Sequence, residues 1–210
     1  MDILGKLLGG VGRVKIMRLF LLNPEQGFET SDVADRSRLS MSVTRRTMTG
    51  LVGMGFVKKK SFIKEVTDGR SGKIKKKRVQ GLFLNVEFPY ITELKGLLIE
   101  GDFIKQDDIV KRFRPAGKVQ LLVVSGIFTK NSGSRLDLLI VGDNIRKSYI
   151  QKTIAVLESE LGKELSYALF DTNDFKYRVS MYDKLLRDLF DYPHERLLAS
   201  KEFSGFVFPS

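Results

Sequence analysis

The stretch Met41–Gly53, Met-Ser-Val-Thr-Arg-Arg-Thr-Met-Thr-Gly-Leu-Val-Gly, decides the fold of the first part of this chain. Residues at helical spacing predict that one side of it is a buried stripe, made of Thr44, Met48, Leu51 and Met54. The opposite side carries only polar groups, namely Ser42, Arg45, Arg46 and Thr49. Gly55 follows as a typical helix-terminating residue. The pattern therefore predicts an amphipathic helix with two neighbouring arginines on its outer face.

Further elements are predicted on both sides of this helix. Apolar residues recur at helical spacing over residues 3–22, with a glycine-rich interruption, which predicts a short helix followed by a longer one. A second short helix is expected over residues 32–37. Residues 56–66 and 74–84 alternate in the manner of strands around the turn-forming run at 67–72, so they predict a β-hairpin.

Positive charge is concentrated in this same part of the chain. The 210 residues carry 36 Lys and Arg against 25 Asp and Glu, a formal net charge of +11. Residues 1–90 contain 18 of these cations but only 8 of the anions, so nearly the whole excess lies there, and it is densest at residues 58–60 and 73–78. Such an asymmetry predicts that one part of the chain meets a polyanion and the other does not. A merely solvated, lysine-rich hairpin is the alternative.

Composition excludes several classes of function. The chain has no cysteine, which removes disulfide scaffolds, cysteine-ligated metals and thiol catalysis, and its only histidine is His194. No apolar run approaches the ~20 residues that span a bilayer, and the first residues do not resemble a signal peptide. We therefore expect a cytoplasmic protein without a membrane partner. The length and the 42% hydrophobic content suit one large domain or two small ones.

The order helix, helix, turn, helix, basic hairpin is that of a winged helix-turn-helix. The chain resembles the ArsR-type winged-helix repressors in residues 12–24 (GRVKIMRLFLLNP), 42–46 (SVTRR) and 55–59 (GFVKK). The resemblance covers roughly residues 10–84, and it implies a DNA-binding transcriptional regulator whose DNA-binding domain occupies residues 1–88. The paired cysteines or histidines with which many such repressors sense metals are absent, so no metal and no cofactor is expected.

This resemblance assigns roles to particular residues. The recognition helix 41–53 would enter the major groove, and the basic wing 57–84 would follow the phosphate backbone. Candidate base contacts are Ser42, Arg45, Arg46 and Thr49. Candidate phosphate contacts are Lys58, Lys59, Lys60, Arg70, Lys73, Lys75 and Lys77. Double-stranded DNA is the expected partner and a homodimer the expected assembly, because a single module is small for specific binding. An RNA-binding or protein-binding module is the alternative.

Residues 89–210 predict a different kind of domain. Near-continuous apolar runs predict buried strands, and these alternate with helical patterns. Strands are expected at 118–125, 136–141 and 165–170, and helices at 91–100, 108–113, 144–161 and 173–190. The expected class of the whole chain is α+β, a winged helix-turn-helix followed by a small α/β domain.

The second domain resembles the minimal nucleotidyltransferase fold, in Ser125-Gly126 after one strand and in residues 134–141 on the next. In active members a Gly-Ser turn cradles nucleotide phosphates, and two aspartates two residues apart hold Mg²⁺. Here the first aspartate position is Arg135, only Asp137 remains, and the strand around residues 166–169 has no carboxylate. The resemblance therefore implies a degenerate, non-catalytic domain, a pseudoenzyme.

Three roles for this second domain remain open from the sequence. One is nucleotidyl transfer, with the winged helix recognising the substrate. Another is a retained nucleotide pocket, with candidate residues Ser125, Gly126, Lys130, Ser134, Arg135 and Asp137. The third is dimerisation or positioning of the winged helices. No particular small-molecule or nucleotide effector is supported by the sequence.

Overall fold

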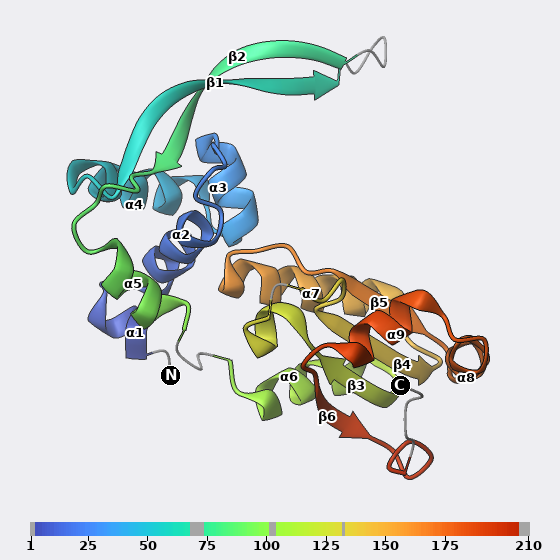
Figure 1. Ribbon diagram of the computed structural model, residues 1–210. Coiled ribbons are helices and arrows are strands. Elements are labelled where there is room, and N and C mark those ends of the chain that lie inside the picture. Colours follow the sequence, from blue (N-terminus) through green and yellow to red (C-terminus); the bar gives the residue numbers. More distant parts are fainter. Residues whose placement is uncertain (1–2, 68–73, 101–103, 132, 206–210) are drawn as a thin grey trace. The chain divides into compact units, whose positions relative to one another are not determined.

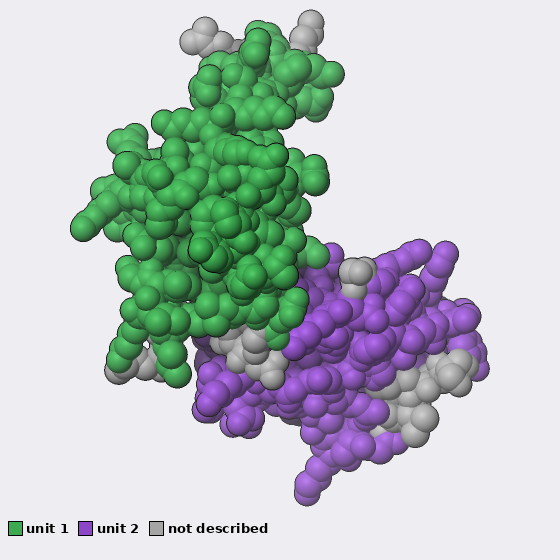
Figure 2. All heavy atoms as spheres, turned by 60° about the vertical axis from the view of Figure 1, so that its left-hand side comes forward, with its two compact units in different colours: residues 1–101, 156–163 green, residues 102–155, 164–210 purple. Residues whose placement is uncertain are grey.

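The computed structural model describes residues 3–67, 74–100, 104–131 and 133–205 (Figure 1). Over these residues the fold is mixed α+β with two sheets, which confirms the predicted α+β class. It divides into two compact units, one made of residues 1–101 with 156–163 and the other of residues 102–155 with 164–210 (Figure 2). In the described part of the chain, no helix has the length and hydropathy needed to cross a membrane.

The first unit contains helices on both sides of a hairpin in the sequence. They are α1 (Ile3–Leu7), α2 (Val11–Leu22), α3 (Thr30–Ser37), α4 (Met41–Gly53) and α5 (Ile91–Leu98). Helix α2 contributes more buried residues to the core of this unit than any other element, and its residues Ile16, Leu19 and Phe20 are almost completely buried. Leu98 at the end of α5 belongs to the same core. Unit 1 therefore extends past residue 88, where the sequence had placed the domain boundary.

Both ends of α4 are set by local residues. The Ser40 side chain accepts a hydrogen bond from the Val43 amide at the N-terminus, and Gly55 has a positive φ of 78° just after the helix. Thr44, Met48 and Leu51 are buried as predicted. Met54 is not, because the helix ends at Gly53 and the Met54 side chain is 54% exposed. The prediction that Met54 completes the buried stripe was therefore wrong.

The hairpin consists of β1 (Val57–Thr67) and β2 (Ile74–Leu84), paired antiparallel from Val57 opposite Leu84 to Thr67 opposite Ile74. Only its base enters the core, through Val57, Leu82 and Leu84. At about 3.3 Å per residue, strands of 11 residues are about 36 Å long. Figure 1 shows the hairpin rising from α4 and projecting past α3.

Residues Val156–Lys163, the last part of helix α7 (Lys147–Leu161) and the turn after it, pack in unit 1. Gly162 has a φ of 83°, and a β-carbon there would lie 2.5 Å from the Leu19 backbone nitrogen. The Gly162 carbonyl accepts a hydrogen bond from the Asn23 side chain at 2.8 Å. The buried Arg18 donates to the carbonyls of Leu98 and Glu160 at 2.9 and 3.1 Å. Helix α2 is thus held by backbone acceptors from two distant parts of the sequence.

The second unit is a four-stranded sheet with helices. Its strands are β3 (Lys118–Val124), β4 (Leu138–Asp143), β5 (Tyr167–Phe170) and β6 (Glu195–Ala199), in the order β5-β4-β3-β6. Strand β3 is antiparallel to both neighbours, and β4 is parallel to β5. The helices are α6 (Gln106–Phe113), α8 (Thr172–Ser180), α9 (Lys184–Asp191) and the first part of α7, together with the 3₁₀ turns η1 (Arg114–Ala116) and η2 (Gly126–Thr129).

Two features of this unit differ from the sequence prediction. The helix expected over residues 173–190 is broken, because Tyr182 adopts a left-handed φ of 54°. Asp183 then caps α9 by accepting hydrogen bonds from the amides of Leu185 and Leu186. Strand β6 was not predicted at all. It lies at the sheet edge, and its residues are exposed or only half-buried.

Candidate nucleic-acid interface

The outer face of α4 presents the four predicted base-contacting residues. Ser42, Arg45, Arg46 and Thr49 are all exposed. On a helix of 3.6 residues per turn they lie opposite the buried Thr44, Met48 and Leu51. Neither arginine has a hydrogen-bond or ion-pair partner for its guanidinium within the described ranges, so both retain their full set of donors. This face has the size and chemistry to contact base edges.

Arg13 on α2 extends this face, and the sequence analysis missed it. Its guanidinium lies beside α4, because a β-carbon at Gly50 would be 3.7 Å from its Nη2 atom. Its Nε is buried and has no hydrogen-bond partner in the part of the chain described here. On the helix Gly50 is one turn beyond Arg46, so Arg13 lies on the same flank of α4 as Arg46. The only available signal was the place of Arg13 within the ArsR-like run.

The candidate phosphate contacts on the hairpin are distributed over two faces. Pairing places Lys58 and Lys60 on one face of the pleat with Lys75 and Lys77, and Lys59 on the other face. All five are exposed. Lys58 forms an exposed ion pair with Glu87 at 2.6 Å, which lowers the pKa of the Glu87 carboxyl. Arg70 and Lys73, also predicted to contact phosphate, lie outside the described residues.

Lys64, which was not a candidate, ties the hairpin to the N-terminus of α3. Its ammonium contacts both carboxylate oxygens of Asp32 at 2.9 Å and a carboxylate oxygen of Glu29 at 3.2 Å. The same two acidic residues form the capping box of α3. The hydrogen bond that Lys64 donates to Asp32 raises the pKa of Lys64 above its ordinary value; partial burial opposes this effect, and Glu29 adds to it.

We expect Lys64→Gln to lower the free energy of unfolding by up to about 1 kcal/mol, since the three side chains are partly exposed. A raised pKa means that this stabilisation is complete below the unfolded-state pKa and disappears as the pH rises through the folded-state pKa. Urea unfolding at pH 7 and pH 11 measures both effects. Lys77→Gln is the matched control, because Lys77 lies directly opposite Lys64 and should cost nothing. Equal losses in both variants would contradict the role of this contact.

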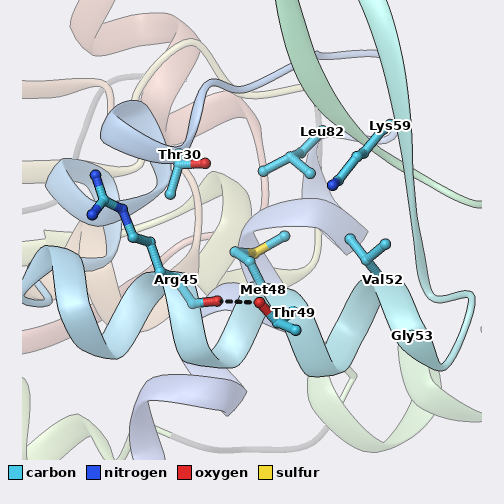
Figure 3. Close-up of a pocket in the computed structure, with 8 residues that line it drawn as sticks. All are labelled: Thr30, Arg45, Met48, Thr49, Val52, Gly53, Lys59 and Leu82. Atoms are coloured by element: carbon cyan, nitrogen blue, oxygen red, sulfur yellow. Dashed lines mark hydrogen bonds between the residues drawn. The ribbon is translucent and has the colours of Figure 1, made fainter.

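A groove runs between α4 and β1. We call it the α4–β1 groove, and it is lined by Thr30, Arg45, Met48, Thr49, Val52, Gly53, Lys59 and Leu82. Figure 3 shows Arg45 and Lys59 at opposite ends of it, with Met48 between them. The groove thus joins two predicted base contacts, Arg45 and Thr49, to one predicted phosphate contact, Lys59.

The predicted nucleotide pocket of unit 2 is occupied by the protein's own groups. The Asp137 carboxylate accepts hydrogen bonds from the amides of Ile127 and Ser166, both at 2.9 Å. Ser125 is fully buried, and its hydroxyl donates to the Pro193 carbonyl at 2.8 Å. A β-carbon at Gly126 would collide with the Asp137 carboxylate. These groups shape the turn after β3, where each carboxylate oxygen of Asp137 accepts from one backbone amide.

Other contacts are made by Arg135 and Ser134, two of the remaining pocket candidates. The Arg135 amide donates to Asp188 at 3.0 Å, and its guanidinium lies 3.7 Å from the same carboxylate. The Ser134 hydroxyl donates to the Leu136 carbonyl at 2.8 Å. Lys130 ends η2 in a left-handed conformation. Among the described residues there is no cluster of three or more His, Asp or Glu that could hold a metal ion.

Compared with known proteins, the chain matches no family model, no curated protein and no solved structure. The fold and the two sites above are therefore the basis for inferring what it does.

Proposed function

We propose that unit 1 is an ArsR-type winged helix-turn-helix and that the protein is a DNA-binding transcriptional regulator. The observation that carries this proposal is the outer face of α4, where Ser42, Arg45, Arg46 and Thr49 are exposed together and the guanidinium groups have no partner among the described residues. An α-helix fits the major groove, and arginine pairs with guanine through two hydrogen bonds. Helices α3 and α4 would be the helix-turn-helix pair.

The hairpin supplies the second half of this proposal. Its exposed lysines follow one another along a ribbon about 36 Å long, which is close to one turn of B-DNA. They would contact phosphates and displace condensed counterions, while α4 reads the sequence. The contact from Lys64 to Asp32 and Glu29 supports the wing beyond its base, so that the two contact surfaces keep a fixed spacing.

We propose a homodimer as the binding form. One winged helix covers only about 600–1,000 Å² of DNA-facing surface, and two copies can occupy half-sites one turn apart. Large apolar side chains are exposed at four-residue intervals at the start of unit 1, on Ile3, Leu7 and Val11. Contact between copies would remove this surface from water. An operator with two-fold symmetry is the expected consequence.

For unit 2 we propose a degenerate nucleotidyltransferase-like scaffold that carries out no transfer. The antiparallel β3 and β4, the parallel β4 and β5 and the intervening helix α7 are compatible with that scaffold. Asp137, the sole aspartate left from the motif, has both carboxylate oxygens engaged by backbone amides. These contacts give Asp137 a structural role in the turn after β3, and Arg135 stands where the motif has its first aspartate.

The first test is fluorescence anisotropy of a labelled random-sequence duplex over a series of salt concentrations. We expect dissociation constants of about 10⁻⁴ to 10⁻⁶ M near physiological salt, weakening linearly in a log-log plot. The double variant Lys75→Gln, Lys77→Gln should lower the slope by about 1.8, since each phosphate contact contributes about 0.9. The double variant Lys147→Gln, Lys152→Gln, on the exposed side of α7 in unit 2, removes the same charge and should leave the slope unchanged.

Two results would overturn the proposal. No binding at low salt would exclude a regulator that acts through DNA. Preferential competition by duplex RNA or by single strands would instead favour an RNA-binding module, which uses the same charges on a different helix geometry.

A further inference from the structure

The α4–β1 groove has an apolar floor. Met48 and Leu82 are 4% and 7% exposed, and Val52 is half-buried. These side chains come from two elements, α4 and β2, that pack in the core of unit 1. Gly53, at the end of α4, adds no side chain to the lining.

The rim of the groove is cationic. Arg45 and Lys59 are exposed, and in the described ranges neither of their charged groups meets a carboxylate. Threonine hydroxyls line the groove as well, from Thr30 and Thr49. The Thr49 hydroxyl donates to the Arg45 carbonyl at 3.0 Å, so its oxygen remains able to accept.

An apolar floor with a polar, cationic rim is typical of a site that binds a small molecule. Such sites are mostly apolar concavities of about 300–1,000 Å³ with a few polar groups that fix the orientation of the ligand. The α4–β1 groove has a volume of about 440 Å³. Its lining contains two cations and no anion, so the groove selects against cationic ligands and favours anionic ones.

We propose that the α4–β1 groove binds a small amphipathic anion, a flat apolar body bearing one carboxylate. The apolar body lies on Met48 and Leu82, and the carboxylate pairs with Lys59 or Arg45. Because Arg45 and Thr49 are also the proposed base contacts, the occupied groove excludes DNA from α4. Binding of the anion stands independently, whereas its effect on DNA rests on the proposed function.

The test uses 2-naphthoate as the probe and the uncharged 2-naphthamide as its near-isosteric control, titrated calorimetrically into the full chain. We expect millimolar or tighter binding of the naphthoate and at least tenfold weaker binding of the amide. Lys59→Gln and Arg45→Gln should each weaken naphthoate binding about three- to tenfold. The matched controls are Lys60→Gln and Arg46→Gln, which alter the next residue in each element and do not line the groove.

Equal affinity for naphthoate and naphthamide, or equal losses in the matched controls, would overturn the proposed site. The same titration in the presence of labelled duplex separates the two proposals. If naphthoate binds to the protein but DNA does not, the proposed anion site stands and the proposed DNA-binding function is contradicted. If DNA stays bound when the groove is saturated with naphthoate, the proposed competition between naphthoate and DNA is contradicted. If DNA binds but naphthoate does not, the proposed anion site is contradicted and the proposed DNA-binding function stands.

Discussion

Replacing Arg45 and Arg46 together with alanine should remove sequence preference while leaving most non-specific affinity. Each bidentate base contact contributes about 1–3 kcal/mol of discrimination, so the loss for both lies between about 30-fold and 10⁴-fold. The measurement compares an operator, obtained by repeated selection from random duplexes, with a scrambled duplex at fixed salt. The ratio of the two dissociation constants should approach one in the variant.

The control for this prediction removes the same amount of charge from the wing. Lys75→Gln with Lys77→Gln should weaken both duplexes by the same factor and keep their ratio, because phosphate contacts carry no direct sequence information. A matching effect of the two double variants on the ratio would mean that α4 does not read bases.

The second large effect is expected from Asp137→Ala in unit 2. The change leaves the amides of Ile127 and Ser166 without their charged acceptor in a site where Asp137 is only 9% exposed. Hydrogen bonds to charged groups contribute about 1.5–3 kcal/mol each, so we expect a loss of about 3–6 kcal/mol for the two. Urea unfolding of the full chain gives the loss, and hydrogen exchange at the two amides locates it.

Asp191→Ala is the control here, since Asp191 is exposed at the end of α9. It should change the stability by less than about 0.5 kcal/mol. The opposite pattern, an Asp137→Ala protein of normal stability that has lost affinity for a nucleotide, would show that Asp137 serves a ligand and not the fold.

The sequence predicted those elements whose pattern is local. Helix α4 and the hairpin were found almost to the residue, because a polar face opposite a buried one and two alternating runs around glycines are complete within about 45 residues. Strand β6 has no such pattern, since an edge strand of half-buried residues is defined by its neighbour. The break at Tyr182 was also invisible, because the apolar spacing continues through it.

In the candidate site, too, the sequence predicted the features that follow from a local pattern and missed those that depend on distant residues. The outward direction of Ser42, Arg45, Arg46 and Thr49 follows from helical periodicity alone. The pairing of Lys58 with Glu87, the contact of Lys64 with Asp32 and the place of Arg13 beside Gly50 depend on residues 29 to 37 positions apart. For unit 2 the motif indicated which residues meet at the turn after β3. It did not indicate that the Asp137 carboxylate would accept hydrogen bonds from two backbone amides.

Unit 1 is discontinuous in sequence, and this affects how the protein is made. Arg18 and Asn23 find acceptors on Glu160 and Gly162, so the first unit is incomplete until residue 163 has been synthesised. At translation rates of about 5–20 residues per second, the ribosome needs roughly 3 to 12 s to pass from residue 101 to residue 163. During this interval the nascent helix α2 carries an arginine, Arg18, whose acceptor on Leu98 has been made but whose acceptor on Glu160 has not. Residues 102–155 emerge before the first unit can close, and the two units therefore finish folding in overlapping order, not one after the other.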